Sequence, residues 1–211
     1  AELMSDESVQ KRFAEELCSL VTKGTTPSKS PSSEKQSVPF LRVTNLGFDG
    51  LIDPTQDFEL ISKSSHKSEL KRSVCYAGDI LMNIVGPPLG KVGVIPDGIG
   101  ECNINQAVLV YRLTGELIDA QYFVNYLLGQ VAQTWLQSQS KKTSGQQNLT
   151  IEICKSLVVP VPSILTQKRL SSCLDAINKV NNLISRKIDS LQFLKRAIAA
   201  DLLSGRKRVS I

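Results

Sequence analysis

The feature that most constrains this chain is a long stretch of helical periodicity in its last quarter, from Thr166 to about Leu203. Apolar residues recur there at spacings of three and four, with almost no residue that breaks a helix. A single helix would leave such a stripe in water, so the pattern requires a partner helix. At about 1.5 Å per residue this helix would be about 50 Å long, which exceeds the helices of most globular domains. We therefore expect a compact N-terminal domain followed by one long helix.

The stripe has the spacing of a coiled-coil seam, and two polar residues interrupt its apolar positions. A polar seam residue costs stability, but it selects the register and the partner of the helix. A long helix that folds back on its own N-terminal domain is the alternative. The seam, and with it the expected dimer contact, consists of Leu170, Leu174, Ile177, Asn181, Ile184, Ile188, Leu191, Lys195, Ile198 and Leu202.

Length and composition predict a cytoplasmic protein without a membrane segment. The 211 residues suffice for one domain with an appendage, and we expect an N-terminal domain at 1–162 and the long helix at 163–211. No stretch approaches about 18 consecutive apolar residues, and residues 1–16 are acidic, unlike a signal peptide. The five cysteines are scattered, without a C-x-x-C pair, which indicates free thiols in a reducing compartment.

The net charge of +5 is distributed unevenly. From Ile164 onward there are ten basic residues against three acidic ones, which leaves 15 basic and 17 acidic residues in the preceding part. The N-terminal domain is therefore close to neutral, and its composition does not predict a strong nonspecific surface for polyanions. The basic helix is consistent with an ordinary solvated face.

The N-terminal domain has the pattern of an α+β fold with a mixed or antiparallel sheet and short helices. Helical periodicity predicts helices at Ser8–Val21 and Asp119–Gln139. Cys102–Leu113, a tight run of β-branched and aromatic residues, is the clearest strand. We expect polar loops at 22–37 and 140–150, and further strands within 38–50, 73–86, 90–98 and 151–162.

No motif assembles a catalytic or metal site. The single histidine, His66, lies in a Ser/Lys-rich segment without an Asp or Cys pattern. The G-P-P-L-G-K run at Gly86–Lys91 has the wrong spacing for a phosphate loop, and Val92 stands where Ser or Thr would bind magnesium. The sequence contains no G-x-S-x-G, H-E-x-x-H or dinucleotide-binding motif. We expect no enzyme, no metal and no cofactor, although a nuclease built on Asp79 and Glu101 is one rival interpretation.

Two polar segments have the composition of loops that contact nucleic acid. The first, around Thr25–Lys29, combines short hydroxyl side chains with a cation, and the second, Lys141–Asn148, combines lysines with amides. Asn and Gln can bond adenine with two hydrogen bonds, Lys and Arg bond guanine, and hydroxyls and Lys bond phosphate. On composition alone, ordinary surface loops are the favoured interpretation of both segments.

Eight short motifs follow one another along nearly the whole chain: G-T-T-P-S at Gly24–Ser28, P-F-L-R-V-T-N-L at Pro39–Leu46, G-D-I-L at Gly78–Leu81, G-K-V-G-V at Gly90–Val94, N-Q-A-V-L-V at Asn105–Val110, T-S-G-Q-Q-N-L-T at Thr143–Thr150, L-V-V-P-V-P-S-I-L-T-Q-K-R-L at Leu157–Leu170 and L-K-R-A-I-A-A-D-L-L-S-G at Leu194–Gly205. In this order the chain resembles one half of the DNA specificity (S) subunit of type I restriction–modification enzymes. Such a half consists of one target recognition domain and one conserved long helix. Each motif alone is weak, whereas eight in the correct order are specific.

The resemblance implies a division of labour between chains. The N-terminal domain would read one half of a bipartite target in double-stranded DNA, and the long helix would pair antiparallel with a second copy to set the distance between the two domains. Chemistry in this family belongs to a modification subunit, which methylates adenine with S-adenosylmethionine, and to a restriction subunit, which uses ATP and Mg²⁺. Full-length members carry two such domains in tandem, so this chain resembles either a natural half-subunit or an excised half.

The resemblance also gives the polar segments a role in reading DNA. The variable loops of these domains carry their specificity, so individual base contacts cannot be transferred to this chain. A coiled-coil adaptor that binds proteins and not DNA remains the rival interpretation, which the near-neutral domain favours. The residues that we expect to face DNA are Lys23, Thr25, Thr26, Ser28, Lys29, Arg42, Asn45, Lys91, Lys141, Lys142, Ser144, Gln146, Gln147 and Asn148. Of these, Arg42 and Asn45 follow a strand and could equally stabilise the adjoining turn.

Overall fold

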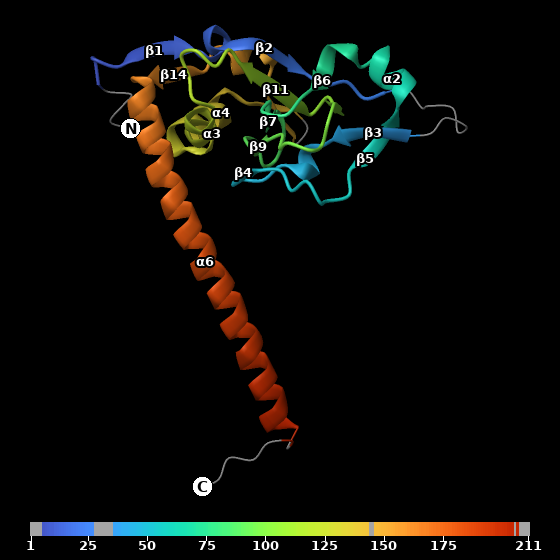
Figure 1. Ribbon diagram of the computed structural model, residues 1–211, viewed down its shortest axis with the longest axis vertical. Helices are drawn as coiled ribbons and strands as arrows, with labels where there is room; N and C mark the ends of the chain where they lie inside the picture. Colours follow the sequence, from blue (N-terminus) through green and yellow to red (C-terminus); the bar gives the residue numbers. More distant parts are fainter. Residues whose placement is uncertain (1–5, 28–35, 144–145, 205, 207–211) are drawn as a thin grey trace. The chain divides into compact units, whose positions relative to one another are not determined.

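The computed structural model describes residues 6–27, 36–143, 146–204 and 206 (Figure 1). The chain divides into two compact units, Ala1–Lys168 and Arg169–Ile211, which we call the globular unit and the helical unit. Within the described residues, the globular unit contains four sheets and several short helices, and one long helix follows. The predicted α+β class is therefore confirmed.

Two larger sheets form the frame of the globular unit. The five-stranded sheet has the order β2 (Cys18–Lys23), β11 (Val108–Leu113), β7 (Ile80–Asn83), β9 (Val92–Val94) and β4 (Gly50–Leu51). All its neighbours are antiparallel except the edge pair β9 and β4. The four-stranded sheet has the order β5 (Glu59–Ser62), β3 (Gln36–Leu41), β10 (Cys102–Ile104) and β6 (Val74–Cys75), in which β3 and β10 are parallel.

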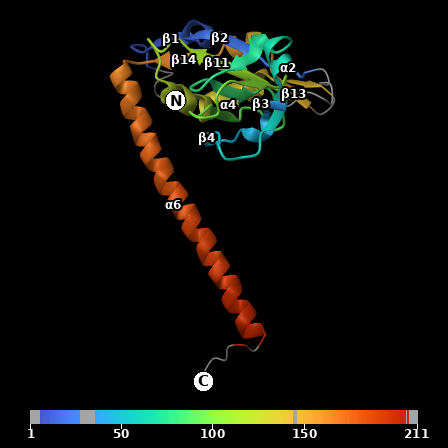
Figure 2. The same ribbon diagram turned by 45° about the vertical axis from the view of Figure 1, so that its right-hand side comes forward.

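Two smaller sheets and the helices complete the fold. Strand β1 (Gln10–Phe13) pairs antiparallel with β14 (Val158–Val161), and Figure 2 shows the two side by side. The last sheet has the order β12 (Lys141–Thr143), β13 (Gln146–Asn148) and β8 (Val85–Gly86). The helices are the 3₁₀ turns η1 (Ala14–Leu17), η2 (Val43–Asn45) and η3 (Lys71–Ser73), and α2 (Lys63–Lys67), α3 (Ala120–Leu128), α4 (Gln130–Gln139), α5 (Ile151–Lys155) and α6 (Ile164–Leu203).

Strand β11 is buried on both faces of its sheet. Successive side chains of a strand point to opposite faces. Val108 and Val110 join a buried cluster with Leu41 and Ile104 of the four-stranded sheet, so this core lies between the two larger sheets. On the other face, the ring of Tyr111 meets that of α3 residue Phe123 edge-on, with the centroids 5.3 Å apart. Helix α3 therefore packs against the outer side of the five-stranded sheet.

The helix expected at Asp119–Gln139 exists, but it is two helices. Asp119 caps the first, accepting a hydrogen bond from the Tyr122 amide at 2.9 Å. Gly129 has extended backbone angles and separates α3 from α4. The Gln133 side chain donates to the Leu127 carbonyl at 2.7 Å, which satisfies one of the carbonyls that a helix end leaves unpaired. The apolar period continues across this break, so periodicity alone could not locate it.

The prediction of a helix at Ser8–Val21 is wrong, because this segment forms β1, η1 and β2. Lys11 pairs with Pro160 of β14, and Val21 pairs with Tyr111 of β11. The apolar spacing that suggested a helix instead places Ala14 and Leu17 of the single 3₁₀ turn in the core. Two ladders to distant strands thus override a weak local preference.

Three further segments also differ from the prediction: the expected strands at 102–113 and within 151–162, and the expected loop at 140–150. Cys102–Leu113 contains two strands, β10 and β11, which belong to different sheets and are joined by a turn in which Val108 donates to the Asn105 carbonyl at 3.1 Å. Residues 151–162 begin with α5, capped by Thr150, before β14. The predicted loop at 140–150 contains the β12–β13 hairpin.

The long helix is confirmed as α6, which includes Thr166–Leu203. Its first turn is fixed to the globular unit by the fully buried side chain of Gln167. That side chain donates to the carbonyls of Leu117 and Pro162 at 3.0 and 2.8 Å, and accepts from the amide of Asp119 at 2.8 Å. Among the described residues, α6 and every other helix are too short or too polar to cross a membrane.

All five cysteines are free thiols, as expected. Cys75 and Cys102 lie opposite each other on β6 and β10, and both are fully buried. Burial raises the pKa of Cys18, Cys102 and Cys154 to about 12, because a low-dielectric environment disfavours the thiolate. These three thiols therefore remain protonated and poorly nucleophilic at neutral pH.

Candidate nucleic-acid interface

The central antiparallel strands of the five-stranded sheet bring several polar segments to one end. Leu109 pairs with Lys23 of β2 on one side and with Met82 of β7 on the other. Strand β2 therefore ends, β11 begins and β7 ends at the same level. We call this the loop end of the sheet. The chain leaves it at Lys23 toward the first polar segment and at Asn83 toward the loop that holds β8.

The first polar segment starts with a close backbone contact. The Gly24 amide donates to the Val108 carbonyl at 3.0 Å, and a Cβ at Gly24 would collide with the carbonyl of Ile104. Glycine is therefore required where the chain leaves the sheet. Thr25 and Thr26, which follow, are exposed. Ser28 and Lys29 lie outside the described residues.

The loop between β7 and β9, to which the second polar segment is attached, is held at the loop end by the buried side chain of Asn83. Its Nδ2 donates to the carbonyls of Val85 at 3.1 Å and Pro88 at 2.7 Å, while its Oδ1 accepts from the Lys91 amide at 2.7 Å. Both N–H bonds and the oxygen of the Asn83 side chain are therefore used within one loop. The loop carries β8 and places Lys91 beside the start of β9.

The hairpin β12–β13 is attached to this loop. Gln147 pairs with Gly86 and Asn148 pairs with Val85, so the amide-rich strand adds directly to β8. Both side chains are partly buried. The side chains of Lys141, Lys142 and Gln146, and Ser144 altogether, lie outside the described part of the chain.

Electrostatics agrees with this convergence of segments. The pKa of Glu152, in the first turn of α5, is lowered chiefly by its own backbone amide and by the Thr150 hydroxyl, with smaller contributions from Lys155 and Lys23. Lys23 of β2 therefore lies within Coulomb range of the helix that directly follows the hairpin. The structure brings together Lys23, Thr25, Thr26, Lys91, Gln147 and Asn148 at the loop end.

Asn83 should position this region more than any other single side chain. Asn83→Leu leaves an amide and two carbonyls without their partner, and we expect it to lower the free energy of unfolding by about 2–4 kcal/mol. Asn125→Leu is the matched control, since the buried Nδ2 of Asn125 has no hydrogen-bond partner in the described structure. Urea unfolding followed by circular dichroism measures both. Equal losses in the two variants would contradict the positioning role.

Arg42 and Asn45 are engaged inside the globular unit. The Arg42 guanidinium pairs with Glu59 at 2.7 Å and lies 6.0 Å from the centre of the Phe40 ring. Asn45 accepts from the Arg42 amide at 2.7 Å and donates to Gln56 at 2.9 Å. These contacts stabilise the turn at η2, which is the second of the two roles that the sequence left open for this pair.

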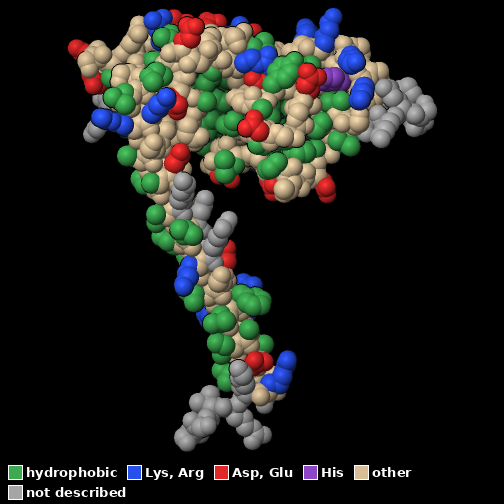
Figure 3. All heavy atoms as spheres, viewed as in Figure 1, with side chains coloured by type: hydrophobic (Ala, Val, Ile, Leu, Met, Phe, Trp, Pro, Cys, Tyr) green, Lys and Arg blue, Asp and Glu red, His purple; other side chains and the backbone are tan. Residues whose placement is uncertain are grey.

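The sequence reasoning missed a group of cations on α2 and η3. Four exposed basic side chains fall within ten residues, and no ion pair joins them to a carboxylate among the residues described. Figure 3 shows Lys and Arg side chains around the single histidine. A local count of charge would have found the group, which a search for apolar periodicity does not register. We call it the α2 cation cluster; it consists of Lys63, Lys67, Lys71 and Arg72.

The two carboxylates of the rival nuclease each have a structural role. Asp79, almost fully buried, accepts two hydrogen bonds from Arg112, at 2.7 and 2.8 Å, and a third from the Tyr76 amide. Glu101 pairs with His66 at 3.2 Å. Among the described residues no three His, Cys, Asp or Glu side chains are grouped to hold a metal ion.

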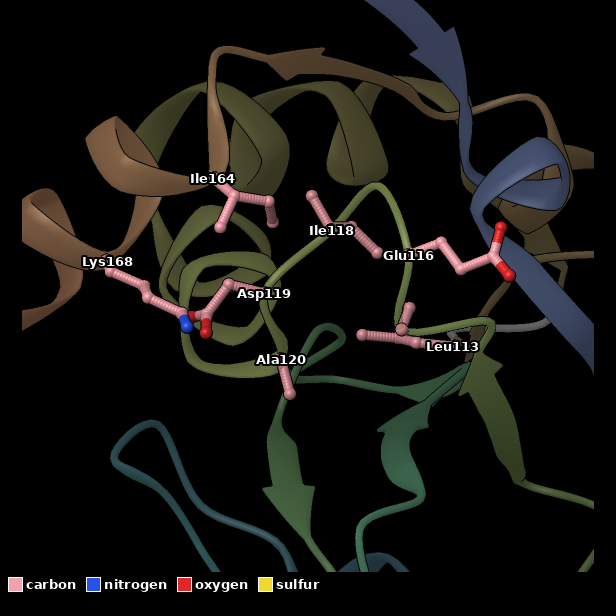
Figure 4. A pocket seen from close by; sticks show the side chains of 8 residues that line it. Leu113, Glu116, Ile118, Asp119, Ala120, Ile164 and Lys168 are labelled. Atoms are coloured by element: carbon pink, nitrogen blue, oxygen red, sulfur yellow. The ribbon is translucent and has the colours of Figure 1, made fainter.

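One pocket of about 380 Å³ lies at the opposite end of β11. Figure 4 shows apolar Leu113, Ile118 and Ile164 in its wall together with Asp119 and Lys168. The loop end lies at Val108, where β11 begins, whereas Leu113 is its last residue. The pocket is therefore separate from the polar segments, and its lining is too apolar to be the nucleic-acid interface.

Comparisons with known proteins converge on one family. A family model described as "Type I restriction modification DNA specificity domain" matches residues 6–192. The type I restriction enzyme EcoBI specificity subunit of Escherichia coli is 32% identical over 164 residues, which are 72% of this chain and 32% of that subunit. A chain from a structure of the type I R-M system and the HsdS subunit of Thermoanaerobacter tengcongensis have TM-scores of 0.63 and 0.61, with 17% and 18% identity. These alignments cover 93% of this chain and 46% and 45% of those chains, and they show likeness of fold.

Proposed function

The chain belongs to the family of type I restriction modification DNA specificity domains, and we propose on this premise that its globular unit reads one half of a bipartite target in double-stranded DNA. This family supplies DNA specificity and not catalysis. The chain spans about a third of the length of the EcoBI specificity subunit and about half of the two solved chains. The activity and partners of a whole restriction–modification subunit are therefore part of the proposal.

The observation that carries the proposal is the convergence of polar segments at the loop end. Thr25 and Thr26 offer hydroxyls, Gln147 offers an amide, and Lys23 and Lys91 offer cations. Hydroxyls and amines suit phosphate, and amides and amines suit base edges in the major groove. Phosphate contacts would set the register of the globular unit on the duplex, and the amide-bearing hairpin would contribute to sequence discrimination.

The exposed apolar face of α6 supports pairing of the long helix with a second copy. Seven apolar seam residues between Leu174 and Leu202 are 42–55% exposed. A helix does not keep such a stripe in water when a partner can cover it. The proposed division of labour places the boundary between residues 162 and 163, immediately before α6, and makes helix length the determinant of half-site spacing.

The apolar surface of α6 is wider than a two-helix seam. Three further apolar side chains, each one position before a seam residue, are also more than half exposed: Val180, Leu183 and Leu194. An additional protein that binds beside the paired helix would cover this second apolar column. We propose the modification subunit as that protein, bound in the cytoplasm by the helix and the adjoining surface of the globular unit, with the restriction subunit joining through it.

Selection of duplexes from a random pool tests the proposal. The full chain, alone and with its modification subunit, is mixed with random duplexes; bound DNA is recovered, amplified and sequenced over several rounds. We expect enrichment of a short motif, repeated at a fixed spacing if two copies pair. A pool that stays random in both arms contradicts DNA specificity and favours the rival adaptor, which would still bind proteins through α6.

A matched pair of variants tests whether the β12–β13 hairpin contributes to sequence discrimination. Gln147→Ala should change or relax the selected motif, because an amide that bonds a base edge carries sequence information. Gln192→Ala, on the helical unit, removes the same side chain far along the sequence from the loop end and should leave the motif unchanged. A motif that both variants retain unaltered contradicts the role of the hairpin.

A further inference from the structure

We infer that the α2 cation cluster binds the phosphate backbone of the duplex and supplies affinity that does not depend on base sequence. The inference rests on the proposed function and adds to it a contact surface that the polar segments do not include. Its four side chains are those of Lys63, Lys67, Lys71 and Arg72, and all are exposed. Exposed cations are often only solvated, so the argument depends on their arrangement and surroundings.

The cluster is concentrated, and it has no ionic partner among the described residues. Lys63 and Lys67 are four positions apart on α2 and therefore project from the same side of the helix. By contrast, three arginines of the globular unit, Arg12, Arg42 and Arg112, each have a carboxylate within 3.3 Å, and Lys155 has one at 3.9 Å. No carboxylate in the described structure lies within ion-pair distance of the cluster.

Among the described residues, two carboxylates lie beside the elements that carry the cluster. Glu69 lies between α2 and η3, and the Glu101 carboxylate lies 3.2 Å from Nε2 of His66. Four cations against these two leave the surface positive. A positive patch on a globular unit that is close to neutral as a whole attracts a polyanion to that patch and not to the surface at large.

The cluster is rigidly mounted. Asn103 of β10 donates through Nδ2 to the carbonyls of Leu70 and Ser73, at 3.0 and 3.1 Å. Its Oδ1 must therefore be the acceptor that lies 2.6 Å from Nδ1 of His66, which carries the proton. One buried amide thus ties α2 and η3 to the four-stranded sheet, so the cations are displayed on a fixed base.

The same part of the fold holds the first polar segment. Gly24 packs against the backbone of Ile104, the residue that follows Asn103 on β10. The chain enters β3 at Gln36, which pairs with Ser62, and Ser62 caps the first turn of α2. Gly24 and Gln36 therefore both lie beside the elements that carry the cluster. A duplex that contacts Thr25 and Thr26 would bring phosphates to α2.

Salt-dependent binding tests the inference. The variant with Lys63, Lys67, Lys71 and Arg72 changed to Gln is compared with a control in which Lys11, Arg169, Lys187 and Arg196 are changed to Gln. Both remove the same charge from exposed positions. Affinity of the full chain for a random-sequence duplex and for its selected duplex is measured by fluorescence anisotropy across a salt series.

The cluster variant should bind both duplexes about 10–100-fold more weakly at low salt, with the slope of log K against log salt reduced by about 3–4. The selected motif should be unchanged, and the control should keep most of the wild-type slope. Equal slopes in cluster variant and wild type overturn the inference while leaving the proposed function intact. If the wild-type chain selects no motif, the proposed function itself fails. An altered motif in the cluster variant would assign these residues to base readout and also overturn the inference.

Discussion

Changing Leu174, Ile177, Ile184 and Ile188 to Gln should convert a dimer of the chain into monomers. Burying an exposed aliphatic side chain contributes about 1.5–3 kcal/mol, and these four are already about half covered in the single chain. Eight such side chains in a pair of helices would then contribute on the order of 8 kcal/mol. Their loss should weaken pairing at least 10⁴-fold, at about 1.4 kcal/mol for each factor of ten.

Sedimentation velocity over a range of concentrations measures the effect. Glutamine is a good helix former, so the substitution removes apolar surface while keeping the helix. The control changes four exposed polar residues of the same helix, Ser172, Lys187, Asp189 and Ser190, to Gln and should sediment as the wild type does. A wild-type chain that is monomeric at all concentrations would contradict pairing through α6 in the isolated chain.

Replacing Arg112 by Leu should destabilise the globular unit strongly. The Asp79 carboxylate would keep only the Tyr76 amide as a partner, at a site where its side chain is 4% exposed. Removing one member of a buried ion pair costs about 3–5 kcal/mol, because the other charge stays buried without compensation. The variant should therefore unfold at a clearly lower urea concentration, or accumulate poorly at 37 °C.

A second arginine in the same unit provides the comparison. Arg42 and Glu59 form an equally short pair, but both side chains are nearly half exposed, so Arg42→Leu should cost less than about 1 kcal/mol. Asp79→Asn combined with Arg112→Leu should be less destabilising than the sum of the single changes, since neither leaves an unpaired charge in the double variant. Similar losses from Arg42→Leu and Arg112→Leu would refute the importance of burial here.

The sequence predicted well where structure depends on a long local pattern. The 40 residues of α6 repeat the helical period of apolar residues many times, so that no other secondary structure fits the segment. The prediction for Ser8–Val21 was wrong because its partner strands, β14 and β11, are about 90 to 150 positions away in the sequence. Pairing over that distance produces no pattern within the segment itself. Similarly, Cys102–Leu113 was recognised as extended, but its division between two sheets at the Asn105 turn depends on tertiary packing.

The candidate interface was predictable in composition and not in arrangement. Hydroxyl, amide and amine side chains identified both polar segments, and the family resemblance supplied their use. Their meeting at one end of a sheet depends on the register in which Lys23, Leu109 and Met82 face one another. The α2 cation cluster was missed because its residues were examined for apolar spacing, which a five-residue helix cannot display.

The anchoring of the polar segments bears on how such a protein acquires new targets. Gly24 and Asn83 fix where the chain leaves the sheet, using backbone contact and one buried amide, whereas Thr25 and Thr26 contribute nothing to the core. Mutation at the exposed positions therefore meets little resistance from folding stability. If the loop end reads DNA as proposed, drift there can explore new DNA sequences while the scaffold, and its helix, stay constant. Engineering of altered recognition should follow the same route, randomising the exposed residues and preserving the two anchors.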